Sequence, residues 1–240
     1  MRTALSPEAA TAKICRAMRM RMRISTNPER QRLVDAAHEA GHALVCLFDG
    51  VDFESVMLAP HADLPSSRVG QLVFHQDSAK RVVGPNLLAR VSCDVAGMVG
   101  EEVVTGLVDE PPKSTEDLYK GCARLGFSPA MATNADLGPL WDVVRRVRAV
   151  LGMRQDAVKA LANALAARGQ LSRAACVGIA QRAKVFVGEP TFTHPALRAD
   201  WVGLVREDAR VDAAIAELNA WRQERVDAAY GEARSQEATR

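Results

Sequence analysis

The sequence predicts a mainly α-helical (α+β) fold with one small β-sheet and a helical C-terminal extension. Apolar residues recur at helical spacing through most of the 240 residues. Aromatic residues make up only 5% of the chain, while alanine and valine are abundant, and this composition favours packing of helix on helix. Two short runs have the composition and pattern of strands, and the alternation of Arg and Met at residues 19–23 could be a further short strand or part of a basic helix. The length suits one large domain, or a domain with an appendage.

The other elements are arranged around a helix predicted over residues 33–50. A capping sequence at residues 26–29 precedes it and includes a proline suited to a first helical turn. The helix contains an H-E-x-x-H motif, in which His38 and His42 lie four residues apart on one face. Two imidazoles placed in this way can bind one zinc ion, and Glu39 can then accept a proton from a water molecule on that ion.

Periodicity and turn residues predict the remaining elements. Two strands are expected at residues 54–58 and 68–74, with a loop between them. A small sheet beside the motif helix would offer an edge to which an extended peptide can add through backbone hydrogen bonds. The residues expected to bind substrate there are Val69, Gly70, Gln71 and Leu72. Helices are expected at residues 85–107, from 114 onward, and at 141–151, 154–168, 171–184 and 200–232, with a turn at 136–139.

The predicted helix at residues 85–107 carries small residues, among them Gly97 and Gly100, which would let another helix approach closely. Glu101 and Glu102 follow in an otherwise apolar stretch. Either glutamate could contact a histidine of the motif, bind the metal, or lie in solvent near the end of the helix.

A catalytic zinc usually takes three protein ligands, so the two histidines need a third. Spacing alone leaves several candidates open: Glu101, Glu102, Asp94, Asp117, His61 and His75. A purely structural zinc is a weaker alternative. Structural sites usually close with four ligands, often cysteines, and no cysteine lies at a suitable spacing in the motif.

Charge and cysteine usage argue against several classes of protein. The net charge of +2 argues against nucleic acid as a partner. Five scattered cysteines without a C-x-x-C pair indicate neither a disulfide framework nor a zinc knuckle, and they fit a reducing cytoplasm. No run approaches the roughly 20 apolar residues that a membrane span needs. We therefore expect a cytoplasmic protein without an integral membrane segment.

The motifs together resemble the protease domain of the FtsH-type zinc proteases, which are membrane-bound AAA metalloproteases. The resemblance begins at residues 37–44, which look like the family's H-E-A-G-H-A signature. It continues at residues 56–60 and 70–72 and includes the helix at 96–102 and the segment 114–118. In all, it extends over residues 28–184.

The resemblance implies that Asp117 is the third zinc ligand, because the family's matching segment ends in Asn-Asp-Leu. Glu39 is then the general base and, later, the proton donor to the leaving amine. The sequence departs from the family pattern at Glu116, where the family has asparagine, and at Met98, where it has arginine. The family's transmembrane segment and AAA ATPase module have no counterpart here, and no P-loop occurs. This implies a free-standing FtsH-like zinc peptidase domain at residues 27–187.

Two further segments flank this domain. Residues 1–26 are rich in arginine with the single acid Glu8, and we expect a basic N-terminal arm that is mobile or covered by a partner. Residues 188–240 are expected to be helical with an apolar face. This face must be buried against the chain's own domain, a second copy of the chain or a partner. We favour self-association into a homo-oligomer, since the related proteases assemble as rings.

The expected function is that of a zinc-dependent metalloendopeptidase. It would cleave unfolded or flexible polypeptides without an ATPase of its own, and a separate adaptor or ATPase could deliver substrate. The alternative is a catalytically weak or inactive FtsH-like module that acts as a binding or regulatory protein. An intact H-E-x-x-H motif favours the enzyme, because a relic without turnover should lose Glu39 early.

Overall fold

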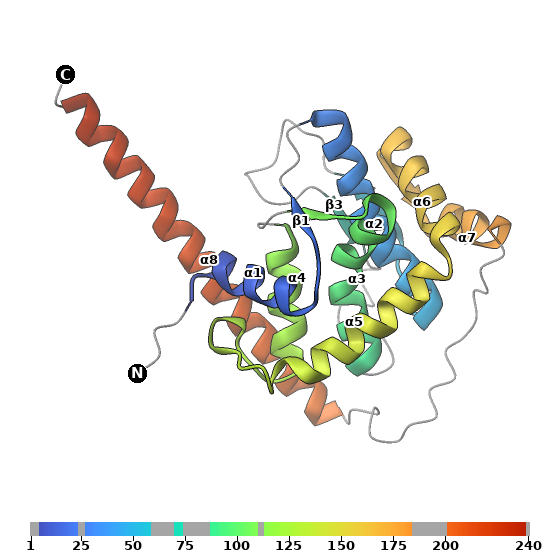
Figure 1. The fold of residues 1–240 in the computed structure, drawn as a ribbon, viewed down its shortest axis with the longest axis horizontal. Coiled ribbons are helices and arrows are strands. Elements are labelled where there is room, and N and C mark those ends of the chain that lie inside the picture. Colours follow the sequence, from blue (N-terminus) through green and yellow to red (C-terminus); the bar gives the residue numbers. More distant parts are fainter. Residues whose placement is uncertain are drawn as a thin grey trace.

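Helices dominate the structure, a computed structural model that describes residues 5–23, 27–58, 70–73, 87–109, 113–183 and 201–238 (Figure 1). The helices are α1 (Pro7–Ala17), α2 (Pro28–Asp49), α3 (Leu87–Thr105), α4 (Lys113–Arg124), α5 (Leu137–Gly152), α6 (Gln155–Arg168), α7 (Arg173–Arg182) and α8 (Trp201–Ala238). A short 3-10 helix, η1, spans Pro129–Met131. The prediction of a mainly α-helical fold with a small sheet is confirmed.

The small sheet has three antiparallel strands in the order β3-β2-β5. Strands β2 (Ser55–Leu58) and β3 (Gly70–Val73) lie within the two predicted strands. Strand β5 (Gln170–Ser172) was not predicted, because three residues directly before a helix show no alternation that could be read. Within the described residues β3 pairs with β2 only, so its other side is an edge of the sheet. A separate pair joins β1 (Met22–Arg23) to β4 (Val108–Asp109) in parallel.

Helix α2 begins and ends where its sequence predicts. The Asn27 side chain accepts hydrogen bonds from the backbone N–H groups of Glu29 and Arg30, at 3.0 and 3.3 Å, and Pro28 occupies the first position. Gly50 ends the helix with φ of 68°, a left-handed conformation that favours glycine. The helix packs against both α3 and α6, so most of its middle is buried.

Helices α2 and α3 touch through their backbones. A Cβ atom built on Gly41 would lie less than 3.0 Å from the Ala96 carbonyl oxygen, and one built on Gly100 would lie less than 3.0 Å from the Ala37 carbonyl oxygen. Real Cβ atoms essentially never come so close. The close approach expected from the small residues of α3 is therefore present, and α2 is the partner.

The N-terminal segment does not form a free arm between residues 7 and 20. Ile14 and Cys15 of α1, and Met18 after it, are buried in the hydrophobic core. The Lys13 ammonium group donates to the Ala132 carbonyl oxygen at 2.6 Å, which ties α1 to the segment after η1. The basic composition misled the prediction, since the apolar positions of a short amphipathic helix are hidden among arginines.

The turn predicted at residues 136–139 is wrong. Helix α5 begins at Leu137 and includes Pro139 in its first turn. Proline is tolerated there because the first N–H groups of a helix have no intrahelical acceptor.

Helix α8 runs beside α4 and then extends away from the rest of the chain (Figure 1). Leu218 is fully buried, and Val211, Ile215 and Trp221 are half-buried by the same chain. The described part of this apolar face is therefore partly covered within the chain, and the homo-oligomer stays a prediction. Among the described helices, none has both the length and the apolar composition that crossing a membrane requires.

Candidate metal centre

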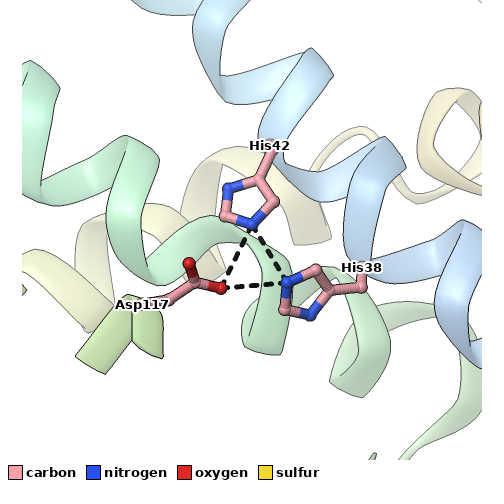
Figure 2. Close-up of side chains that lie close together, drawn as sticks. All are labelled: His38, His42 and Asp117. Carbon is pink, nitrogen blue, oxygen red and sulfur yellow. Dashed lines mark hydrogen bonds and ion pairs between the residues drawn. The ribbon is translucent and has the colours of Figure 1, made fainter. Parts of the chain in front are cut away.

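Three side chains from two helices converge at one point. His38 and His42 project from α2, and Asp117 projects from α4 (Figure 2). The Nε2 atoms of the two histidines are 3.1 Å apart. The Asp117 Oδ2 atom is 2.9 Å from His38 Nε2 and 3.4 Å from His42 Nε2. These donor atoms all lie within 4.8 Å of one another, so the group can hold a metal ion.

The outer nitrogen of each imidazole ring has its own acceptor. His38 Nδ1 lies 2.6 Å from Glu101 Oε1, and His42 Nδ1 lies 2.7 Å from the Cys93 carbonyl oxygen. A carboxylate and a carbonyl oxygen accept hydrogen bonds, so both Nδ1 atoms donate. The Nε2 atom of each neutral ring then presents a lone pair, as metal-ligating histidines do when their other nitrogen is held in this way.

Two lone pairs and a carboxylate oxygen therefore meet with no donor between them, and a cation is needed there. Without a metal ion, the cation is a proton. Burial alone would lower the His38 pKa, but hydrogen bonds with Asp117 and Glu101 outweigh it and raise this pKa to about 10. The charge of Asp117 likewise outweighs burial and raises the His42 pKa well above its ordinary value. Burial opposes ionisation of Asp117, yet the two histidines hold its pKa far below the ordinary range.

The space at the centre exists because residue 97 is glycine. A Cβ atom on Gly97 would lie less than 3.0 Å from both Nε2 atoms of His38 and His42. Any side chain at this position would press against the donor nitrogens of both histidines. The donor set and the open space beside it both fit a metal ion.

Glu39 is buried beside this group and next to the edge of the sheet. A Cβ atom on Gly70 of β3 would lie 2.7 Å from Glu39 Oε1, so β3 passes directly over this carboxyl group. Burial raises the pKa of Glu39, although the nearby histidines act in the opposite direction. A buried carboxyl group with a raised pKa is suited to accepting and returning a proton.

The other candidates have different partners. Glu101 contacts His38 but is not one of the three converging donors. Glu102 forms a two-bond ion pair with Arg148 at 2.7 and 3.0 Å, away from the centre. Asp94 accepts from Arg124 at 2.7 Å. His61, His75 and Val69 lie outside the described residues. Of the expected substrate strand, Gly70 and Leu72 are half-buried and Gln71 is exposed.

Sequence reasoning missed two features of the centre. The Cys93 carbonyl oxygen that accepts the hydrogen bond from His42 is a backbone group, so no residue type in the sequence indicates it. Gly97 was noted for helix packing, whereas its more specific role is to leave room between the histidines. Its position four residues before Glu101 was an available signal, since both must then face the same neighbour.

No protein-family model and no curated protein matches this chain. The donor geometry and the chemistry of the side chains around it are therefore what assigns a role to this centre.

Proposed function

We propose that the chain is a zinc-dependent endopeptidase of the FtsH-like type, acting on unfolded or flexible polypeptides. The observation that carries the proposal is the convergence of His38, His42 and Asp117, with both Nδ1 atoms engaged and Glu39 adjacent. Two imidazoles and one carboxylate are a ligand set that hydrolytic zinc enzymes use, and three protein ligands leave a position open.

The same ligand set also suits Fe(II) in oxygenases. Glu39 favours hydrolysis, because a buried carboxyl group beside the donors has a use in moving protons. Zinc held there would polarise a peptide carbonyl and lower the pKa of a water molecule towards about 7. Glu39 would take a proton from the attacking water and return it to the leaving amine.

Strand β3 is the element best placed to orient a substrate. Within the described residues β3 is an edge strand, and it passes over Glu39 at Gly70; an extended peptide can add to the edge of a sheet through backbone hydrogen bonds. This kind of binding requires an extended chain, which is why unfolded or flexible polypeptides are the proposed substrates. ATP should have no effect on cleavage by the purified chain.

The test joins metal analysis to a cleavage assay. We expect the purified chain to contain zinc and to cleave a disordered protein, and we expect a chelator to remove both properties. Glu39→Gln should keep its zinc but lose at least about 100-fold in activity, the lower range for loss of a general acid–base group. Glu217→Gln, which changes an exposed glutamate on α8, is the matched control and should behave like the parent.

Three results would count against the proposal. Iron in place of zinc would indicate another chemistry for the same ligands. Full activity of Glu39→Gln would remove the role of this residue. A zinc-loaded chain that cleaves no disordered protein would favour the alternative, a binding or regulatory module without turnover.

A further inference from the structure

Two cysteines meet beside the metal centre. The Sγ atoms of Cys46 on α2 and Cys93 on α3 are 3.3 Å apart, although the residues are 47 positions apart in the sequence. All five cysteines lie in the described part of the chain and are free, and this is the one pair there whose sulfur atoms are in contact. The sequence showed five scattered cysteines and gave no sign of the pair.

The pair is joined to the metal centre on both sides. Cys46 lies one helical turn beyond His42 on the same helix. Cys93 supplies the carbonyl oxygen that accepts from His42 Nδ1 at 2.7 Å. A change in the position of either cysteine is therefore transmitted to one of the three converging donors.

We propose that Cys46 and Cys93 are a site of reversible oxidation by hydrogen peroxide, forming a disulfide that weakens metal binding at His42. Disulfide formation is independent of the proposed function, whereas the effect on metal binding rests on it. Such reversible pairs are the usual form of disulfide in reducing compartments.

The chemistry balances with peroxide as the only oxidant. We take Cys93 as the sulfur that peroxide reaches first, since the residue is 8% exposed and Cys46 is fully buried. Its sulfur attacks one peroxide oxygen, an S–O bond forms, the O–O bond breaks, and one water leaves. The Cys46 sulfur then attacks the Cys93 sulfur, an S–S bond forms, the S–O bond breaks, and a second water leaves. Two electrons pass from the sulfurs to peroxide, and the two thiol protons end in the waters.

The bond must change the local structure. A disulfide bond is about 2 Å long, so the two sulfurs have to approach. The helices as a whole cannot close up, because their backbones already touch at Gly41 and Gly100. The two side chains and the turns that carry them must therefore adjust, and the turn of α3 that carries Cys93 also holds the carbonyl oxygen that is the acceptor for His42. Loss of such a partner typically lowers metal affinity roughly 10- to 100-fold.

The experiment uses the full chain. Metal-free protein is treated with hydrogen peroxide, digested without reduction and analysed by mass spectrometry, and zinc affinity is measured by competition with a chromogenic chelator before and after treatment. A phosphine reductant reverses the oxidation. Cys46→Ala removes one partner of the pair, and Cys122→Ala changes another buried cysteine as the matched control.

We expect a linked Cys46–Cys93 peptide in the parent and in Cys122→Ala. In both, peroxide should weaken zinc binding roughly 10- to 100-fold, and the phosphine should restore it. Peroxide should leave the zinc affinity of Cys46→Ala unchanged. Absence of the linked peptide, or a link between other cysteines, would overturn the proposal, as would an unchanged affinity of the linked protein. A linked peptide in a chain that never binds zinc would support the disulfide, and would overturn the coupling together with the proposed function.

Discussion

Helices α2 and α4 both carry donors of the candidate metal centre, but different kinds of contact hold them in place. Helix α2 meets α3 backbone to backbone, where neither Gly41 nor Gly100 leaves room for a methyl group. Helix α4 meets α3 through side chains. A Cβ atom on Gly121 would lie 3.6 Å from its nearest neighbours, an ordinary van der Waals distance.

Charged side chains hold the rest of α4. Arg124 pairs with Asp94 of α3 at 2.7 Å, and Glu116 lies 3.6 Å from Arg222 of α8. Backbone contacts cannot relax by rotating a side chain, whereas ion pairs and side-chain packing can. The two histidines are therefore fixed by contacts that a single methyl group would break. Asp117 lies on a helix whose side-chain contacts can adjust by small movements.

The largest effect is expected for Gly97→Ala. The added methyl group would lie less than 3.0 Å from both Nε2 atoms, and the rings cannot turn away without losing Glu101 and Cys93 as acceptors. Zinc affinity should fall more than about 100-fold, beyond the range for loss of an outer hydrogen-bond partner. Zinc titration measures this effect. Gly121→Ala is the matched helical glycine and should bind zinc like the parent. Parent-like binding by Gly97→Ala would show that the ion does not lie between the histidines.

The next effect is that of Asp117→Ala. It removes one of three converging donors while leaving both histidines held at Nδ1. Zinc bound per chain should fall to a small fraction of the parent value, as measured by elemental analysis after dialysis. Asp142→Ala, which changes an exposed aspartate on α5, serves as the control. If Asp117→Ala keeps its zinc while a variant of Glu101 or Glu102 loses it, the assignment from the resemblance is wrong.

A smaller effect is expected from pH. In the metal-free chain the folded-state pKa of His38 is raised from 6.5 to about 10, so protonation of this side chain stabilises the fold. That stabilisation is complete below about pH 6.5 and is lost as pH rises through about 10. The melting temperature of the metal-free chain should therefore fall over this window. In Asp117→Asn, which lacks the main partner of His38, the fall should be smaller. An equal fall in both would mean that other groups cause it.

The smallest effect is expected for Arg222→Ala, which removes the contact between α8 and Glu116. The contact is long and both side chains remain partly open to solvent, and pairs near the surface are worth about 0–1 kcal/mol, so zinc affinity should change by at most about fivefold. Arg225→Ala is the control, since Arg225 pairs with Glu8 of α1 at 2.8 Å rather than with α4. A large loss in Arg222→Ala alone would show that α8 sets the position of Asp117 as firmly as the glycines set that of the histidines.

The sequence predicted the helices well, because long periodic segments with caps carry their own signal. Asn27 and Gly50 mark the ends of α2, and His38 and His42 share a face by spacing alone. Asp117 was different: spacing left six candidates open, and only the resemblance selected it. Of the two adjacent glutamates, Glu101 faces α2 and Glu102 faces Arg148 on α5, a difference of one step around α3. Choosing between them requires knowing which helix lies on which side.

Contacts between distant segments could not be predicted either, because they too depend on which elements pack together. Strand β5 is too short to show a pattern, and its pairing with β2 joins residues 170–172 to 55–57. The Cys46 and Cys93 sulfurs meet only because α2 and α3 touch at their glycines. Periodicity describes the faces of each element, and tertiary packing decides which faces meet.

The separation of the donors along the chain has a consequence for folding. His38 and Asp117 are 79 residues apart, so the unfolded chain offers no preformed site. By mass action, an ion that binds only the folded state stabilises it by about 2.7 kcal/mol at a free concentration of 100 times its dissociation constant. We therefore expect the melting temperature to rise with free zinc in the parent and to stay constant in Asp117→Ala. The fraction of folded chain would then depend on the zinc supply of its surroundings, independently of any reaction that the centre performs.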